Sequence, residues 1–184
     1  MGQNKALMPF HGIPLIQRVA ERVTAIAAEV NIISSDEPDY RFLNLPVIPD
    51  QIPGKGVLGG IHTAILVSRT AFVAPVGCDL PFISAALLKA ELNLIIDCGA
   101  DVVIPESQNG LEPLHAVYRK STCLPLVENS LLRGENRIIN WFENAIVKIV
   151  SQAEVTQIDP DPRIFLNLNR PDEFARASKN TEGS

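Results

Sequence analysis

Asp79 is the residue whose setting most clearly suggests chemistry. It follows the apolar run 71–76 and two small residues, Gly77 and Cys78. Such a run is typical of a buried strand, and in open α/β sheets ligands bind beyond the carboxyl ends of the strands. A single carboxylate in that place is suited to a hard divalent cation that also binds phosphate oxygens. Asp79 could instead cap the next helix, but Ser84 directly precedes the helical stretch and is the better cap.

Two glycine-containing segments are suited to phosphate groups. Lys5 follows Gly2 ahead of an apolar helix, and a lysine behind a turn can neutralise a phosphate, although such pairs also occur on ordinary surfaces. The segment 54–60 contains four glycines, follows Asp50 and leads into a helix N-terminus, where anions are favoured. A flexible connector would have the same composition, so this segment alone leaves both interpretations open.

Other polar residues lie near predicted strand ends. Asn167 and Asn169 alternate, which predicts that both amides lie on one face of a strand, where they could bind a cation or a polar ligand. Paired asparagines are also common in turns. The segment 133–137 carries two arginines suited to a phosphate. His115 lies in an apolar strand, which is more typical of a packing residue than of a general base.

Predicted helices and strands alternate along the chain. Continuous apolar strands favour a mostly parallel sheet with helices on both faces, in an α/β fold. We expect a single domain over 1–180 and a disordered tail over 181–184. Helices are predicted over 14–28, 61–68, 85–92, 122–129 and 134–142, and strands over 29–34, 46–50, 71–76, 99–105, 113–118, 145–150, 155–158 and 165–169.

Composition limits the classes of function. The 184 residues, 46% of them hydrophobic, suffice for one domain with a sizeable core. A formal net charge of −5 and scattered basic residues argue against nucleic acid as a partner. No apolar stretch approaches the roughly 20 residues of a membrane span and no signal peptide is visible, so we expect a cytoplasmic protein without membrane association. Three widely spaced cysteines predict free thiols, two of them buried.

Five segments, taken in order, resemble the molybdenum cofactor guanylyltransferases. The resemblance implies a three-layer, Rossmann-like nucleotidyltransferase fold, transfer of GMP from GTP to molybdopterin with release of pyrophosphate, and Mg²⁺ at the site. GTP and molybdopterin would be the small-molecule substrates, and molybdoenzymes or their chaperones the protein partners. No segment is specific alone, but their order and spacing are. The segments are 1–7 (MGQNKAL), 58–60 (LGG), 77–82 (GCDLPF), 113–118 (PLHAVY) and 167–171 (NLNRP).

The resemblance also implies roles for single residues. Lys5 matches a lysine that contacts the GTP phosphates, and Asp79 an aspartate that binds both Mg²⁺ and nucleotide; these two are the predicted catalytic residues. Ser34 loosely matches a nucleotide-contacting asparagine. The predicted nucleotide-binding residues are Lys5, Ser34, Asp50, Gly59, Gly60 and Asp79. The residues expected on the molybdopterin side are Pro113, His115, Arg137, Asn167 and Asn169, with the asparagines near the reacting phosphates.

The chain departs from the family pattern at its beginning. Family members have a strand and a Leu-Ala-Gly-Gly type loop ahead of the Met-Gly that stands here at 1–2, and that loop binds the base and the triphosphate. We therefore expect an N-terminally incomplete domain, which starts late or is truncated and leaves sheet edges exposed. The alternatives are a molybdopterin cytidylyltransferase, another small-molecule nucleotidyltransferase, and a catalytically impaired protein that binds nucleotide or molybdopterin.

Overall fold

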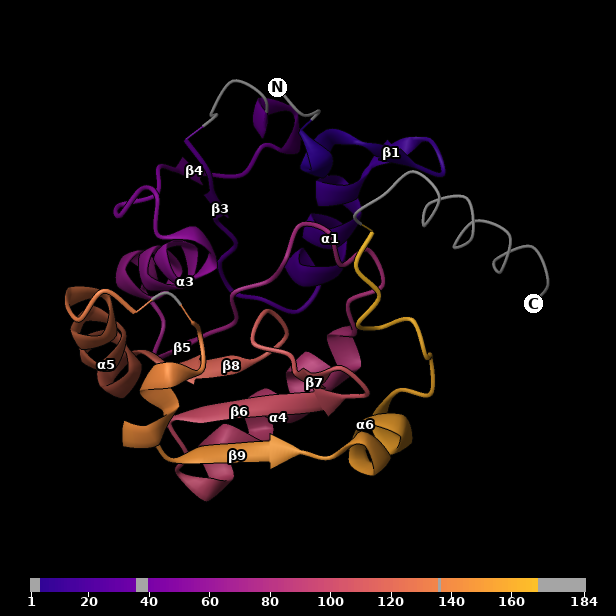
Figure 1. The fold of residues 1–184 in the computed structure, drawn as a ribbon. Coiled ribbons are helices and arrows are strands. Elements are labelled where there is room, and N and C mark those ends of the chain that lie inside the picture. The colour runs from indigo at the N-terminus through magenta and orange to yellow at the C-terminus, as the bar shows by residue number, and fades with distance from the viewer. Residues whose placement is uncertain (1–3, 36–39, 136, 169–184) are drawn as a thin grey trace.

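The structure is a computed structural model that describes residues 4–35, 40–135 and 137–168 (Figure 1). A β-sheet lies at its centre, and helices cover both faces of this sheet. The five strands of the sheet are β5 (Phe72–Val73), β6 (Val102–Ser107), β7 (Gly110–Leu111), β8 (Val117–Arg119) and β9 (Val147–Val150).

The strand directions differ from the predicted mostly parallel arrangement. Among the described strands of this central sheet, only β6 and β9 pair in parallel, whereas β5–β8, β6–β7 and β6–β8 are antiparallel. The cause is the short connections between β6, β7 and β8, because a parallel neighbour needs a crossover of a dozen or more residues, usually a helix. The central sheet is therefore mixed.

Four helices form the outer two layers of the α/β architecture. The side chains of β6 alternate, so that Val102 and Ile104 pack with one pair of helices and Val103 packs with the other pair. Figure 1 shows α3 and α5 side by side, and α6 after the end of β9. The first pair is α3 (Gly56–Val67) and α5 (Lys120–Leu132), and the second is α4 (Ala85–Cys98) and α6 (Gln152–Ile158).

Two small sheets and a helix form the N-terminal part of the structure. Strands β3 and β4 pair in parallel, and β1 and β2 form a hairpin whose turn residues, His11 and Gly12, both have positive φ. The apolar side of α1 is buried, as its amphipathic pattern predicts. These elements are η1 (Lys5–Leu7), β1 (Pro9–Phe10), β2 (Ile13–Pro14), α1 (Leu15–Thr24), β3 (Ile32–Ile33), η2 (Arg41–Leu43) and β4 (Val47–Ile48).

The segment 155–158, predicted as a strand, belongs to helix α6. A capping box begins this helix: the Ser151 hydroxyl accepts from the N–H of Glu154, and the Glu154 carboxylate accepts from the N–H of Ser151 at 2.8 Å. Four residues with two apolar members fit a short strand and a short helix equally well. The cap ahead of the segment therefore decides its structure.

The prediction of a helix over 134–142 is also wrong. Gly134, with φ of 75°, follows the end of α5, and only the short 3₁₀ helix η3 (Asn140–Asn144) forms later. Of the three free thiols, only that of Cys123 is buried, whereas Cys78 and Cys98 are exposed. None of the described helices is long and apolar enough to span a membrane.

Candidate active site

The loop over residues 77–83, which we call the Asp79 loop, is a compact turn built around a glycine. The N–H of Leu80 donates to the carbonyl of Gly77 at 3.3 Å, and the N–H of Ile83 donates to the carbonyl of Leu80 at 3.1 Å. The Asp79 carboxylate folds back over Gly77, where a Cβ atom would lie 2.7 Å from Asp79 Oδ1. A Cβ atom at residue 77 would therefore displace the carboxylate from this position.

Helix α4 begins directly after this loop, as predicted. The Ser84 hydroxyl accepts from the N–H of Leu87 at 3.0 Å, so Ser84 is the N-cap of α4. The half-buried Asp79 side chain is not needed for this cap and makes no hydrogen bond or ion pair within the described ranges. Its oxygens thus remain available to a ligand.

Lys5 lies close to the Asp79 loop although it is far away in the sequence. The protein atoms packed around the Cys78 thiol raise its pKa by desolvation, although the residue as a whole is exposed to solvent; the Asp79 carboxylate raises this pKa further and the Lys5 ammonium lowers it. One thiol is thus exposed to the charges of both predicted catalytic residues. Lys5 is itself exposed, at the start of η1, and its neighbour Ala6 is buried and anchors this short helix.

The end of the described chain also reaches the Asp79 loop. The N–H of Leu168 donates to the carbonyl of Asp79 at 3.0 Å, and the Leu168 side chain is buried with Phe10 and Phe82. Asn167 is therefore an exposed neighbour of Asp79. Residues 166–168 form no strand, in contrast to the prediction, and Asn169 lies outside the described residues.

A second group of predicted residues gathers at the carboxyl ends of β3 and β4. Ser34 directly follows β3, and its N–H donates to the carbonyl of Ile48 at 2.9 Å. Asp50 follows β4, and its Oδ1 accepts from the N–H of Ile52 at 3.0 Å and from the hydroxyl of Thr63 at 2.9 Å. The Asp50 carboxylate thus ties the loop after β4 to helix α3.

The glycines of α3 differ in how closely the chain approaches them. A Cβ atom on Gly59 would lie 2.9 Å from the carbonyl oxygen of Ile52 and 3.3 Å from Asp50 Oδ2. Gly60 has open space around the same position. The segment 56–60, predicted as a loop before the helix, forms the first turn of α3 itself. Gly59 therefore has a packing role, and Gly60 leaves its surroundings accessible.

The residues expected on the molybdopterin side are not brought together. The Pro113 carbonyl accepts from the Tyr118 hydroxyl at 2.8 Å, and Arg137 is exposed in the turn between α5 and η3. His115 is completely buried, as expected of a packing residue, so its ring is not open to a ligand. Within the described ranges, no hydrogen bond or ion pair joins Arg137 to the Asp79 loop.

Glu91 is a buried ionisable residue that the sequence reasoning did not identify. Its side chain is 0% exposed on α4, and burial raises its pKa to about 7 although His115 opposes this rise. Glu91 lies four residues from both Leu87 and Ile95, which share the buried face of the helix. A charged residue in that periodic apolar pattern was the signal in the sequence.

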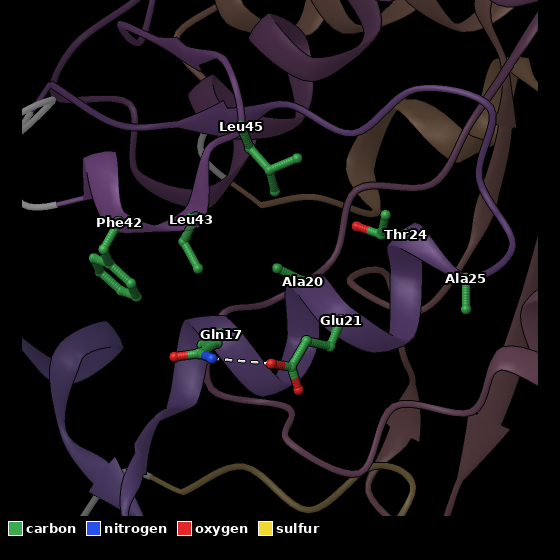
Figure 2. A pocket seen from close by; sticks show the side chains of 8 residues that line it. All are labelled: Gln17, Ala20, Glu21, Thr24, Ala25, Phe42, Leu43 and Leu45. Carbon is green, nitrogen blue, oxygen red and sulfur yellow. Dashed lines mark hydrogen bonds between the residues drawn. The ribbon is translucent and has the colours of Figure 1, made fainter.

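A cavity of about 470 Å³ lies between α1 and the segment 42–45 (Figure 2). Its walls are largely apolar and include Ala20, Phe42 and Leu45, while Gln17 donates to Glu21 at 2.9 Å along its rim. None of the predicted nucleotide-binding residues lines this cavity. It therefore gives no support for a nucleotide there.

The residues of the Asp79 loop fit a magnesium ion only if a substrate supplies further ligands. No group of three or more His, Cys, Asp or Glu side chains suited to a metal occurs in the described part of the chain. Mg²⁺ typically takes one or two carboxylates together with water and substrate phosphates, and it does not need a closed protein cage. The carboxylate of Asp79, which has no partner among the described residues, fits that pattern.

Comparisons with known proteins agree on one family. The family model of the MobA-like NTP transferase domain matches residues 1–149. A probable molybdenum cofactor guanylyltransferase of Carboxydothermus hydrogenoformans is 34% identical over 97% of this chain and 89% of the relative. Another from Pelotomaculum thermopropionicum is 34% identical over 100% of this chain and 88% of the relative.

A solved structure shows the same fold. Molybdopterin-guanine dinucleotide biosynthesis protein A from Archaeoglobus fulgidus superposes with a TM-score of 0.85 at 24% sequence identity. The match covers 100% of this chain and 93% of the other. The α/β nucleotidyltransferase fold is thereby confirmed.

Proposed function

The chain belongs to the MobA-like NTP transferase family, and we propose that it is a molybdenum cofactor guanylyltransferase. This enzyme transfers GMP from GTP to molybdopterin and releases pyrophosphate. The names of the relatives favour a guanine nucleotide over a cytosine nucleotide, since the fold alone does not select a base. Transfer of the product to molybdoenzymes or their chaperones stays a prediction, as does a cytoplasmic location.

The observation that carries the proposal is that the charges of Lys5 and Asp79, which are far apart in the sequence, both act on the Cys78 thiol in the Asp79 loop. A triphosphate needs positive charge near its oxygens, and an ammonium is suited to offset charge that develops during transfer. The half-buried carboxylate of Asp79 would repel a phosphate alone, and it would become favourable if it held a divalent cation that neutralises both charges. A site that offers both a positive and a negative side chain thus suits a metal-bound nucleotide better than a free anion.

The reaction needs no general base from the protein. We infer in-line attack by the terminal phosphate oxygen of molybdopterin on the α-phosphorus of GTP. A bond from that oxygen to the α-phosphorus forms, the bond between the α-phosphorus and the bridging oxygen breaks, and pyrophosphate leaves with the electron pair. A phosphate monoester loses its second proton near pH 6, so the attacking oxygen is largely ionised at pH 7. The burial of His115 is compatible with this chemistry.

The work of the chain is positioning and neutralisation of charge. Lys5 would offset charge on the phosphates, and Asn167 lies next to Asp79, where its amide could orient a phosphate oxygen. Asp79 would hold Mg²⁺, which supplies Lewis-acid stabilisation of the phosphate oxygens when it is bound. Ser34, Asp50 and Gly60, at the ends of β3 and β4, would form the adjoining part of the nucleotide site.

Pyrophosphate release tests the proposal directly. Purified protein with Mg²⁺ and molybdopterin is expected to release pyrophosphate with GTP and not with CTP. Release with CTP alone would favour a cytidylyltransferase, and tight nucleotide binding without any release would favour a catalytically impaired binding protein. Neither result would be compatible with guanylyl transfer.

A matched pair of variants tests the role of Asp79. Asp79→Asn keeps the shape of the side chain and removes its charge, so kcat is expected to fall about 100-fold or more. Asp97→Asn makes the same change at an exposed site near the end of α4 and is expected to leave kcat unchanged. Turnover of Asp79→Asn within a few-fold of the wild type would contradict the assignment of the metal ligand.

A further inference from the structure

The Asp79 loop is held at both of its ends by one buried residue, His115. On the side before the loop, Val76 forms an antiparallel bridge with His115. On the side after it, the N–H of Ser84 donates to His115 Nε2 at 3.3 Å. The backbone of His115 thus contacts the residue before the Asp79 loop, Val76, and its ring contacts the residue after the loop, Ser84.

The hydrogen bond to Ser84 determines the tautomer of the ring. A backbone N–H can only donate, so Nε2 must present a lone pair and the ring proton must lie on Nδ1. His115 Nδ1 lies 3.5 Å from Glu91 Oε1, and both side chains are 0% exposed. This separation is a close polar contact and not a hydrogen bond, since within the described ranges neither His115 Nδ1 nor either oxygen of Glu91 has a hydrogen-bond partner. Glu91 is thereby the acceptor that faces the Nδ1 proton.

The surroundings hold this arrangement in place. The Ser84 hydroxyl donates to Asp159 Oδ2 at 2.5 Å, and the ring of Phe165 lies edge-on to the ring of His115, with centroids 5.3 Å apart. Two further ionisable side chains, Glu112 and Tyr118, interact electrostatically with this pair. The imidazole is therefore enclosed by protein on every side and has no surface exposed to solvent.

We propose that His115, kept as the Nδ1–H tautomer by Glu91, is a positioning residue that holds Asp79 in place for nucleotidyl transfer. The inference rests on the proposed function, because it assigns His115 to the same reaction. His115 touches neither the nucleotide nor the metal ligand, and it acts only through the two ends of the loop. This role differs from the contact with molybdopterin that the resemblance implied.

Two amide substitutions separate the two ring nitrogens of His115. In His115→Gln the side-chain oxygen can reach the position of Nε2 and accept from Ser84, whereas the shorter amide of His115→Asn reaches only the position of Nδ1. We expect His115→Gln to retain kcat within about fivefold, and His115→Asn to lose about 30- to 100-fold, because small displacements of reacting groups cost that much. The KM for GTP should change by less than about threefold in both, since the nucleotide contacts remain.

His62 provides the matched control. It is 4% exposed and its Nε2 lies 3.4 Å from Glu128 Oε1, but this pair joins α3 to α5 on the other face of the sheet. His62→Asn is expected to lower the melting temperature and leave kcat unchanged. Equal kcat losses in His115→Asn and His115→Gln, or a similar loss in His62→Asn, would overturn the proposal and leave only a general effect on folding.

The tautomer itself is measurable without turnover. Long-range ¹H–¹⁵N correlation spectra of protein labelled at histidine are expected to show His115 with its proton on Nδ1, and His115→Gln assigns the signals by their disappearance. A proton on Nε2 would overturn the proposed positioning while leaving guanylyl transfer intact. A wild-type protein that has the expected tautomer but releases no pyrophosphate would instead overturn the proposed function.

Discussion

Replacement of Glu91 by Gln is expected to change how the stability of the protein depends on pH. The folded protein holds the Glu91 proton with a pKa of about 7, compared with an ordinary value of 4.5, chiefly because of burial. The folded state therefore binds this proton more tightly than the unfolded state does. The resulting stabilisation is fully present below pH 4.5 and is lost as the pH rises through 7.

The size of the effect follows from the shift. Each pKa unit corresponds to 1.36 kcal/mol, so the rise to about 7 corresponds to about 3 kcal/mol of unfolding free energy. A glutamine of the same shape does not titrate. The free energy of unfolding of Glu91→Gln minus that of the wild type should thus increase by about 3 kcal/mol between pH 4.5 and pH 8. The change corresponds to roughly 6–12 °C in melting temperature for a domain of this size.

Urea unfolding of both proteins at half-unit pH steps measures this difference, with fluorescence and circular dichroism compared as a test of two-state behaviour. Glu143→Gln is the control, because Glu143 is exposed and its carboxylate stays in water in both states. A difference that does not change with pH would refute the reasoning. It would mean that water from the cavity of about 270 Å³ between α4 and α6, which Glu91 helps to line, hydrates the carboxylate in the folded protein.

Two further predictions concern glycines. Gly77→Ala is expected to abolish most pyrophosphate release with little loss of secondary structure, because the added Cβ would lie 2.7 Å from Asp79 Oδ1 and displace the carboxylate. Turnover near the wild-type level would contradict the description of the loop. Gly59→Ala is expected to lower the unfolding free energy by about 1–3 kcal/mol, because its Cβ would lie 2.9 Å from a backbone oxygen. Gly60→Ala is expected to raise the unfolding free energy by up to about 1 kcal/mol, because there is open space around its Cβ and alanine favours the helix. Thermal unfolding of the two proteins side by side decides, and equal destabilisation would contradict the packing role of Gly59.

Features encoded by neighbouring residues could be predicted from the sequence, and features encoded by distant contacts could not. The cap at Ser84 and the start of α4 depend on adjacent residues and are confirmed. The mixed sheet depends on the antiparallel pairing of β6 with β7 and β8. The absence of a predicted helix between 105 and 113 was a usable signal of that antiparallel pairing. The apolar residues of 155–158 predict a strand, whereas the capping box at Ser151, which is also a local signal, predicts the helix that forms.

The same distinction applies to the candidate site. Asp79 stands out because of its place after an apolar run, and the structure does leave its carboxylate unpaired within the described ranges. The nucleotide-binding role of Asp50 stays a prediction, and one of the hydrogen bonds that its Oδ1 accepts comes from Thr63, a residue on α3. The pairing of Glu91 with His115 requires α4 to pack against the sheet. No local pattern contains that information.

The hydrogen bond from Leu168 to the carbonyl of Asp79 has a consequence for biosynthesis. The ribosome makes a chain from its N-terminus at about 5–20 residues per second, so Leu168 appears on the order of 10 s after Asp79. All the described helices and strands precede Leu168 in the sequence and can pack during this interval. The Asp79 loop receives its last anchor only then, so a nascent chain can be largely folded well before it is able to bind its substrates.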